Sequence, residues 1–329
     1  AAISAPPVRA GLRDLFKAWQ DSHEAEGKSA RTVTDFRGKL ESLIAFRKSD
    51  SLGSLDQRGI VEWLEHLRDR QELSAKTIAD KYLAALKAIL SHAKGRFLID
   101  TDPSEGIQWK KTKQPALRGK GFTDSEALAI LTAAGNAPPK GTNWQAQRIR
   151  ATQWGPWLLA YTGARVVEIM QLRTGDIGEE GGIVFLHITP EAGSTKTSEA
   201  RQVPIHSHLI EKGFLEMVQA LPEGPIFTTP SATKAEAHRK AQAMGGRLTE
   251  WFWAETGIED RTLSPNRGWR HRFKTIGRKQ DIQAQTLDAI QGHTLAGASG
   301  GYGEVDLETK RNAIERFPRY QIKTTRDHD

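Results

Sequence analysis

Apolar residues recur at helical spacing through most of the first hundred positions. Leu12, Leu15, Phe16 and Trp19 open the pattern, and residues three and four apart lie on one face of a helix. The same spacing predicts helices over 32–46, 60–67 and 74–93, the last with a capping serine at its first position. Together these segments predict a compact helical bundle over residues 9–108.

A basic segment follows the bundle. Prolines and glycines between 103 and 119 interrupt any regular element, and we interpret residues 109–122 as an interdomain linker. Two interpretations stay open: a solvated connector, or a strap lying across DNA phosphates. The candidate DNA-binding residues in the strap interpretation are Lys110, Lys111, Lys113, Arg118 and Lys120.

The remaining chain, 123–329, predicts a second domain that begins with a capping box at Thr123–Glu126. Two runs rich in β-branched and apolar residues, 181–189 and 200–206, predict a pair of strands joined by a polar loop. Helical patterns occupy 147–161, 209–221, 235–256, 264–279, 286–290 and 307–317. The predicted fold class is therefore mainly α (α+β): a helical bundle plus a mixed, mostly helical domain with a small β-sheet.

Composition narrows the possible partners. The 329 residues carry a formal net charge of +7, which favours a polyanion, nucleic acid before a membrane surface. The absence of cysteine excludes disulfides and thiolate zinc sites, and is typical of a reducing, cytoplasmic compartment. No apolar run reaches the length of a membrane span. His206 and His208 lack a suitably spaced carboxylate, so we expect no metal.

Four short stretches carry residues suited to phosphate chemistry. In TGARVVEIMQL an arginine follows a small-residue turn, and Glu168 lies one helical turn later, where it can brace the arginine. A lysine lies in the loop between the predicted strands. RGWRHRF and GHTLAGASGGYGEV complete the set. The candidate catalytic residues are Arg165, Lys196, Arg267, Arg270, His293 and Tyr302.

The order of these boxes resembles the tyrosine recombinase (phage integrase) family. The family pattern is an arginine in TG-x-R-x-x-E, a hairpin lysine, H-x-x-R-H-x-F, then G-H with a tyrosine nine residues after that histidine. The resemblance covers roughly 122–305, and the first bundle resembles the family's SAM-like core-binding domain in size and position. Two positions depart from the pattern: Arg267 stands where histidine is usual, and Gln291 where leucine is common.

The resemblance implies a site-specific recombinase or integrase that cleaves and rejoins double-stranded DNA through a 3′-phosphotyrosine link to Tyr302. Arg165 and Arg270 would hold the phosphate, Lys196 would protonate the leaving 5′-oxygen, and His293 would contact a non-bridging oxygen. No cofactor is implied. The implied assembly is a homo-tetramer on DNA and a monomer when free, in the cytoplasm of a bacterial or phage-infected cell, associated with the nucleoid.

Several alternatives stay open. Arg267 cannot accept a proton; it would add a phosphate contact, and the tyrosine proton would leave through His293, His271 or solvent. The helix at 307–317 would pack on a neighbouring protomer, as in the family, or on its own domain. Arg165 and Glu168 could form only an ion pair, Lys196 could be solvated, and Tyr302 could be a packed loop residue. A catalytically lapsed DNA-binding protein and a topoisomerase IB-like relaxer remain the alternative functions.

Overall fold

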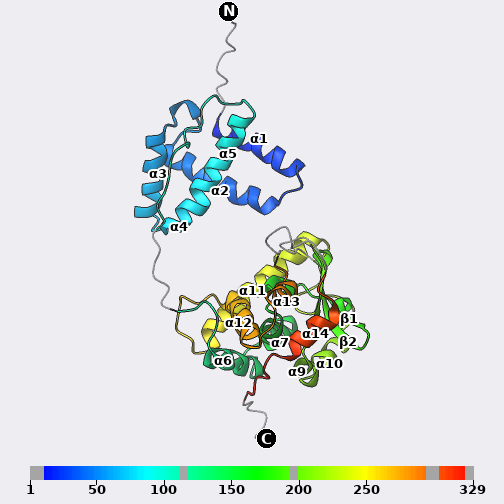
Figure 1. The fold of residues 1–329 in the computed structure, drawn as a ribbon. Coiled ribbons are helices and arrows are strands. Elements are labelled where there is room, and N and C mark those ends of the chain that lie inside the picture. The colour runs from blue at the N-terminus through cyan, green and yellow to red at the C-terminus, as the bar shows by residue number, and fades with distance from the viewer. Residues whose placement is uncertain (1–10, 112–117, 193–198, 294–303, 323–329) are drawn as a thin grey trace, which may run out of the picture. The chain divides into compact units, whose positions relative to one another are not determined.

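A computed structural model of the chain describes residues 11–111, 118–192, 199–293 and 304–322. The chain divides into two compact units, 1–116 and 117–329, and each has its own hydrophobic core (Figure 1). Among the described helices, none combines the length and the apolar character needed to cross a membrane.

The first unit is a helical bundle, as the apolar pattern predicts. Trp63, Leu64 and Leu67 lie fully buried at its centre. The hydroxyl of Ser74 accepts a hydrogen bond from the Thr77 backbone N–H, so the predicted cap is confirmed. The last helical stretch contains a π-helical turn at Ile78–Leu83, which periodicity does not reveal. The helices are α1 (Leu12–Ala25), α2 (Ala30–Arg47), α3 (Gln57–Asp69), α4 (Ala75–Thr77) and α5 (Ala84–Gly95).

The second unit surrounds a small sheet with helices. The described part of this unit has three strands, β1 (Ile177–Glu180), β2 (Ile183–Ile188) and β3 (Arg201–Pro204), which pair antiparallel in sequence order. The prediction of two strands missed β1, because its sequence IGEE lacks apolar alternation. The helices are α6 (Asp124–Gly135), α7 (Ala146–Thr162), α8 (Val166–Met170), α9 (Ser207–Glu211), α10 (Phe214–Gln219), α11 (Lys234–Glu255), α12 (Pro265–Lys279), α13 (Ala284–Gln291) and α14 (Leu307–Glu315).

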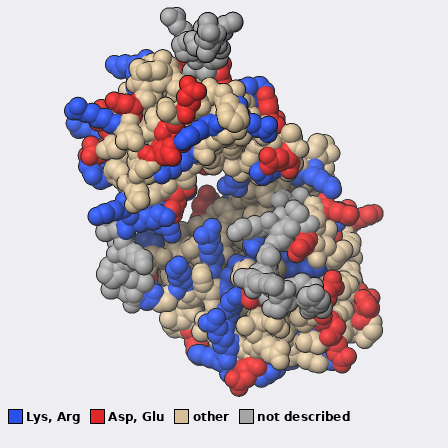
Figure 2. All heavy atoms as spheres, turned by 45° about the horizontal axis from the view of Figure 1, so that its top comes forward, with Lys and Arg blue, Asp and Glu red and all other residues tan. Residues whose placement is uncertain are grey.

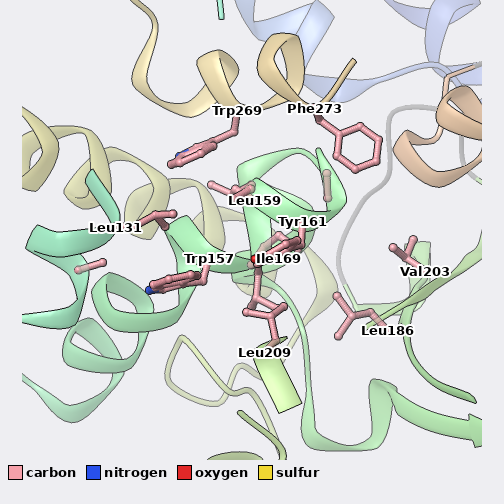
Figure 3. Packing of buried hydrophobic residues seen from close by; sticks show 14 of the residues in the cluster. Leu131, Trp157, Leu159, Tyr161, Ile169, Leu186, Val203, Leu209, Trp269 and Phe273 are labelled. Carbon is pink, nitrogen blue, oxygen red and sulfur yellow. The ribbon is translucent and has the colours of Figure 1, made fainter. Parts of the chain in front are cut away.

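The core of this unit fixes α7, α12 and the sheet against one another (Figure 3). Leu186 pairs with Val203 across β2 and β3, and both are fully buried. Trp157 and Tyr161 of α7 are buried in the same cluster as Trp269 and Phe273 of α12. This packing fixes the ends of α7, α12 and β3, from which the candidate site is built.

The tail helix α14 packs on its own unit. It lies against β3 and α13, and Ala313 and Ile314 are buried. Phe317 stacks on Phe273 with ring centroids 4.4 Å apart. The sequence left two positions open for this helix, on its own domain or on a neighbouring protomer. In the structure it lies on its own domain, because the apolar face of α14 completes this core.

The expectation about metal concerned His206 and His208. The imidazole of His206 lies 3.1 Å from the Phe317 carbonyl oxygen, and no group of three potential metal ligands occurs among the described residues.

Candidate active site

A glycine at the end of α7 allows three elements to meet. Gly163 adopts a left-handed φ of 57°, which favours glycine. A Cβ at this position would lie 2.4 Å from the Gln291 side-chain nitrogen and 2.7 Å from the Phe273 ring. Only a residue without a side chain lets α12 and α13 approach so closely. The TG turn of the sequence box is thus the point where the site is assembled.

Glu168 orients two arginines from different elements. Arg165, the N-cap residue of α8, donates from its backbone N–H and from its guanidinium to the two carboxylate oxygens, at 2.9 and 2.8 Å. Arg201, the first residue of β3, donates to the same carboxylate at 2.7 Å and to the Ile290 carbonyl at 3.0 Å. The side chain of Glu168 is only 2% exposed. A buried carboxylate flanked by two guanidiniums fixes the direction of both.

Arg270 is held by the backbone around it. Its guanidinium donates to the Gly163 carbonyl at 2.6 Å and to the Gln291 carbonyl at 3.1 Å. The buried side chain of Gln291 donates back to the Arg270 carbonyl at 2.9 Å. The departure from leucine at position 291 therefore adds a polar brace between α13 and α12.

Burial and neighbouring charges both shift the pKa values of these groups. Burial, together with the charge of Arg165, lowers the pKa of Arg270 to about 10, so the guanidinium stays charged at pH 7. Burial alone would raise the pKa of Glu168, but Arg201 and Arg165 outweigh burial and hold it below its ordinary value. The site therefore combines the charged guanidinium of Arg270 with a buried carboxylate that pairs with Arg165 and Arg201.

The guanidiniums keep donors for a further ligand. Each arginine has five N–H donors. Arg270 uses two on carbonyls and directs one at His293, while Arg165 uses one on Glu168 and one on the Gly292 carbonyl. Two donors on Arg270 and three on Arg165 are thus without a partner among the described residues. Such groups suit a phosphate, which accepts paired hydrogen bonds from guanidinium.

His293 lies beside Arg270 and is held from behind by an acidic residue. Its Nε2 is 2.5 Å from an Arg270 guanidinium nitrogen, and its Nδ1 is 2.8 Å from a carboxylate oxygen of Asp288. Lys274 of α12 forms an ion pair with the same carboxylate at 2.6 Å. The structure therefore brings Arg165, Arg270 and His293 together, as the order of the boxes predicts.

The remaining candidate residues from the sequence either lie outside this hydrogen-bonded cluster or lie outside the described residues. Arg267 lies exposed one turn before Arg270 on α12, and its guanidinium makes no hydrogen bond or ion pair within the described residues. His271 lines a separate pocket with Lys120, Lys274 and Arg278, of about 570 Å³. Lys196 and Tyr302 lie outside the described residues, and their roles stay predictions.

The predicted strap residues differ in their surroundings. Arg118 forms an internal ion cluster with Glu126 and Asp260, at 2.6 and 3.0 Å, and Lys111 is paired with Asp80. Lys110 and Lys120 are exposed, and Lys113 lies outside the described residues. Figure 2 shows lysine and arginine side chains gathered on one face of the second unit. That face and the exposed Lys120 are therefore better placed than Arg118 to contact a polyanion.

Sequence reasoning missed two residues of the site. Arg201 is the first residue of β3, five positions after Lys196 in the sequence, and it pairs with Glu168, which is 33 positions away along the chain. Asp288 precedes His293 by five positions, so the turn that ends α13 brings the two side chains together. The sequence contains two signals for these residues. Arg201 is a charged residue at the start of a predicted strand, and Asp288 is an acidic residue five positions before a candidate histidine.

Comparisons with known proteins agree over both units. Residues 15–100 match the family model described as phage integrase, N-terminal SAM-like domain. The chain is 28% identical over 311 residues to tyrosine recombinase XerC of Neisseria meningitidis serogroup C / serotype 2a, covering 91% of this chain and 93% of that protein. XerC of Rhizobium meliloti is 26% identical over 274 residues, covering 82% of this chain and 76% of that protein.

Solved structures share the fold at low identity. A lambda integrase tetramer bound to a Holliday junction aligns with a TM-score of 0.63 at 14% identity, covering 93% of this chain and 86% of that chain. The XerH site-specific recombinase bound to difH aligns with a TM-score of 0.52 at 16% identity, covering 92% and 84%. Fold and sequence thus point to the same group of proteins.

Proposed function

We propose a mechanism for this chain, which belongs to the tyrosine recombinase family and is a site-specific DNA recombinase. The hydroxyl of Tyr302 attacks a phosphorus of the DNA backbone and forms a 3′-phosphotyrosine bond, while the bond from phosphorus to the 5′-oxygen breaks. The leaving oxygen takes a proton from Lys196. In the reverse step a 5′-hydroxyl of a partner strand attacks the phosphotyrosine and releases Tyr302.

The convergence of Arg165, Arg270 and His293 carries this proposal. The attacked phosphate gains negative charge on its non-bridging oxygens in the transition state, and fixed donors stabilise that charge. The free N–H groups of Arg165 and Arg270 lie on guanidiniums already oriented by Glu168 and by the Gly163 carbonyl. Because these donors are held before DNA arrives, little reorganisation is needed as charge develops.

The chemistry conserves the energy of the broken bond. A phosphodiester is exchanged for a phosphotyrosine, which another 5′-hydroxyl can reverse without a nucleotide or metal. At pH 7 an ordinary tyrosine with a pKa of about 10 costs about 4 kcal/mol to ionise. The guanidiniums of Arg165 and Arg270 would lower that cost for a hydroxyl brought to the phosphate. Arg267, exposed one turn from Arg270, would contact a neighbouring DNA phosphate.

The proposed partner is double-stranded DNA, bound through the basic face of the second unit and through Lys110, Lys113 and Lys120. We propose four copies on DNA and a single copy free in solution, acting on DNA in the cytoplasm. Self-docking of α14 in the structure fits a single free copy, since no partner is needed to cover its apolar face.

A capture experiment tests the function. The full chain is incubated with a pool of nicked duplexes of randomised sequence, in which cleavage releases a short fragment and prevents rejoining. Complexes that survive denaturation are recovered, and their DNA is sequenced. We expect one recurring sequence with wild type and none with Tyr302→Phe.

The recovered duplex then separates the alternatives. Joining of two such duplexes supports a recombinase. Relaxation of a supercoiled plasmid without joining would indicate a topoisomerase-like enzyme, and binding with no covalent complex would indicate a lapsed DNA-binding protein.

A further inference from the structure

The hydrogen bonds around His293 determine which of its nitrogens carries a proton. A guanidinium has only N–H donors and no acceptor, so the Nε2 that faces Arg270 at 2.5 Å presents its lone pair. The proton of the neutral ring therefore lies on Nδ1, where it is donated to the Asp288 carboxylate at 2.8 Å. His293 is thus a neutral imidazole whose acceptor nitrogen lies on the side of the arginines.

The surroundings of Asp288 favour this arrangement. Burial raises the pKa of Asp288, but the hydrogen bonds from Lys274 and His293 outweigh burial and hold it below its ordinary value. The carboxylate is therefore charged and accepts from both neighbours. The backbone N–H of His293 also donates to the Asp288 carbonyl at 2.9 Å. Two contacts to one residue fix the ring in rotation and in position.

Burial and the positive charges that face the ring favour its neutral form near pH 7. Burial lowers the pKa of His293, and the positive charges of Arg270 and Lys274 lower it further, against the opposing effect of Asp288. A protonated ring would also direct an N–H at the N–H of Arg270. His293 in the free protein is therefore suited to accept a proton rather than to donate one to a phosphate oxygen.

We propose that Asp288 is a positioning residue that holds His293 as the Nδ1–H tautomer, so that Nε2 takes the proton of the attacking hydroxyl. This inference rests on the proposed function. A bound phosphate draws the Arg270 donor to its anionic oxygen, a stronger acceptor than a neutral imidazole, and this frees Nε2. The proton then passes from the hydroxyl oxygen to Nε2, and the resulting imidazolium stays paired with Asp288. On rejoining, Nε2 returns the proton to the tyrosine oxygen.

This assignment selects His293 from the routes left open for the proton. Arg267 cannot accept it. His271 points into the separate pocket with Lys120 and Arg278, whereas His293 is in contact with Arg270. Asp288 and His293 thus supply the acceptor that the histidine-to-arginine departure at position 267 removes.

The first test requires no DNA. Nuclear magnetic resonance of the full chain labelled with ¹⁵N-histidine reports which ring nitrogen carries hydrogen, and His293→Gln identifies the signal. We expect the Nδ1–H form at pH 7 in wild type and in Asp281→Asn, and loss of that preference in Asp288→Asn. Asp281 is a matched control, because it is exposed at a positive φ of 50° that asparagine tolerates. An Nε2–H form or an imidazolium in wild type would overturn the proposal whatever the protein does to DNA.

The second test uses cleavage of the duplex recovered by capture, in a single turnover. We expect Asp288→Asn to cleave roughly 10- to 100-fold more slowly and His293→Gln roughly 10²-fold or more, the range for a lost proton acceptor. Wild-type cleavage falls as pH drops through the pKa of His293. Removal of the carboxylate charge lowers that pKa, so the acid limb of Asp288→Asn moves to lower pH. An acid limb that stays in place would show a merely structural role and overturn the proposal.

A modified substrate separates the two proton transfers. Sulfur in place of the leaving 5′-oxygen leaves without a proton, so it removes the need for an acid but not for an acceptor. The deficits of Asp288→Asn and His293→Gln should persist on this substrate. Their rescue by sulfur would place both residues on the leaving-group side, against the proposal and not against the recombinase function itself.

Discussion

Replacing Glu168 by glutamine tests how the arginine cluster is held. The side chain is 2% exposed and accepts hydrogen bonds from the Arg165 backbone, the Arg165 guanidinium and the Arg201 guanidinium. Glutamine is nearly isosteric, but it removes the charge and turns an N–H₂ group toward existing donors. Removing one partner from a buried ion pair costs about 3–5 kcal/mol. For a unit of this size about 2–4 °C is lost per kcal/mol, so the melting temperature of the second unit should fall by about 6–20 °C.

Calorimetry of the full chain measures this change. Glu211→Gln is the matched control, because Glu211 pairs with Arg319 at 2.6 Å in the same unit but is 56% exposed. An exposed pair contributes about 0–1 kcal/mol, so the control should change the melting temperature by at most a few degrees.

The pH dependence gives an independent check. The pKa of Glu168 is lower in the folded chain than its ordinary value. Its contribution is therefore fully present above the pKa of an unfolded glutamate, about 4.3, and is lost as pH falls through the folded pKa. The difference between wild type and Glu168→Gln should be constant from about pH 6 to 8 and shrink in acid. A Glu168→Gln chain as stable as Glu211→Gln at pH 7 would refute the idea that this carboxylate holds the cluster.

Three further substitutions probe the site. Gly163→Ala should destabilise the second unit in calorimetry, because its Cβ would lie 2.4 Å from a Gln291 atom. The control Gly246→Ala, with open space on an exposed helix face, should be neutral or stabilising by up to about 1 kcal/mol. Equal effects of the two substitutions on stability would contradict this reasoning. Arg270→Lys should slow single-turnover cleavage by about 10²–10³-fold, and an unchanged rate would remove Arg270 from the chemistry. Lys120→Gln should reduce the slope of log affinity for DNA against log salt by about 1, whereas Arg118→Gln, which breaks an internal ion cluster, should chiefly lower thermal stability.

The sequence predicts most of the helices, for reasons visible in the structure. Leu12, Leu15, Phe16 and Trp19 are all buried, because a helix with one apolar face must cover it. The predicted helix over 209–221 is instead two helices, since Gly213 takes a left-handed φ of 88° between them. A single glycine inside an apolar pattern does not reveal such a break.

The contacts within the site could be predicted only in part. The spacing of boxes identifies Arg165, Arg270 and His293 because each lies in a local pattern. The roles of Arg201 and Asp288 come from contacts made after folding: β3 brings Arg201 to Glu168, and the end of α13 brings Asp288 under His293. Residues that act on other side chains leave no pattern of their own in one sequence.

The most direct measurement identifies the atom that becomes attached to DNA. The captured complex is trimmed with nuclease, digested with protease and examined by mass spectrometry. We predict a single nucleotide-bearing peptide in which Tyr302 is joined to a 3′-phosphate, absent when Tyr302 is phenylalanine. Attachment to another residue, or through a 5′-phosphate, would contradict the proposal that the arginines around residues 165 and 270 activate a phosphate for this tyrosine.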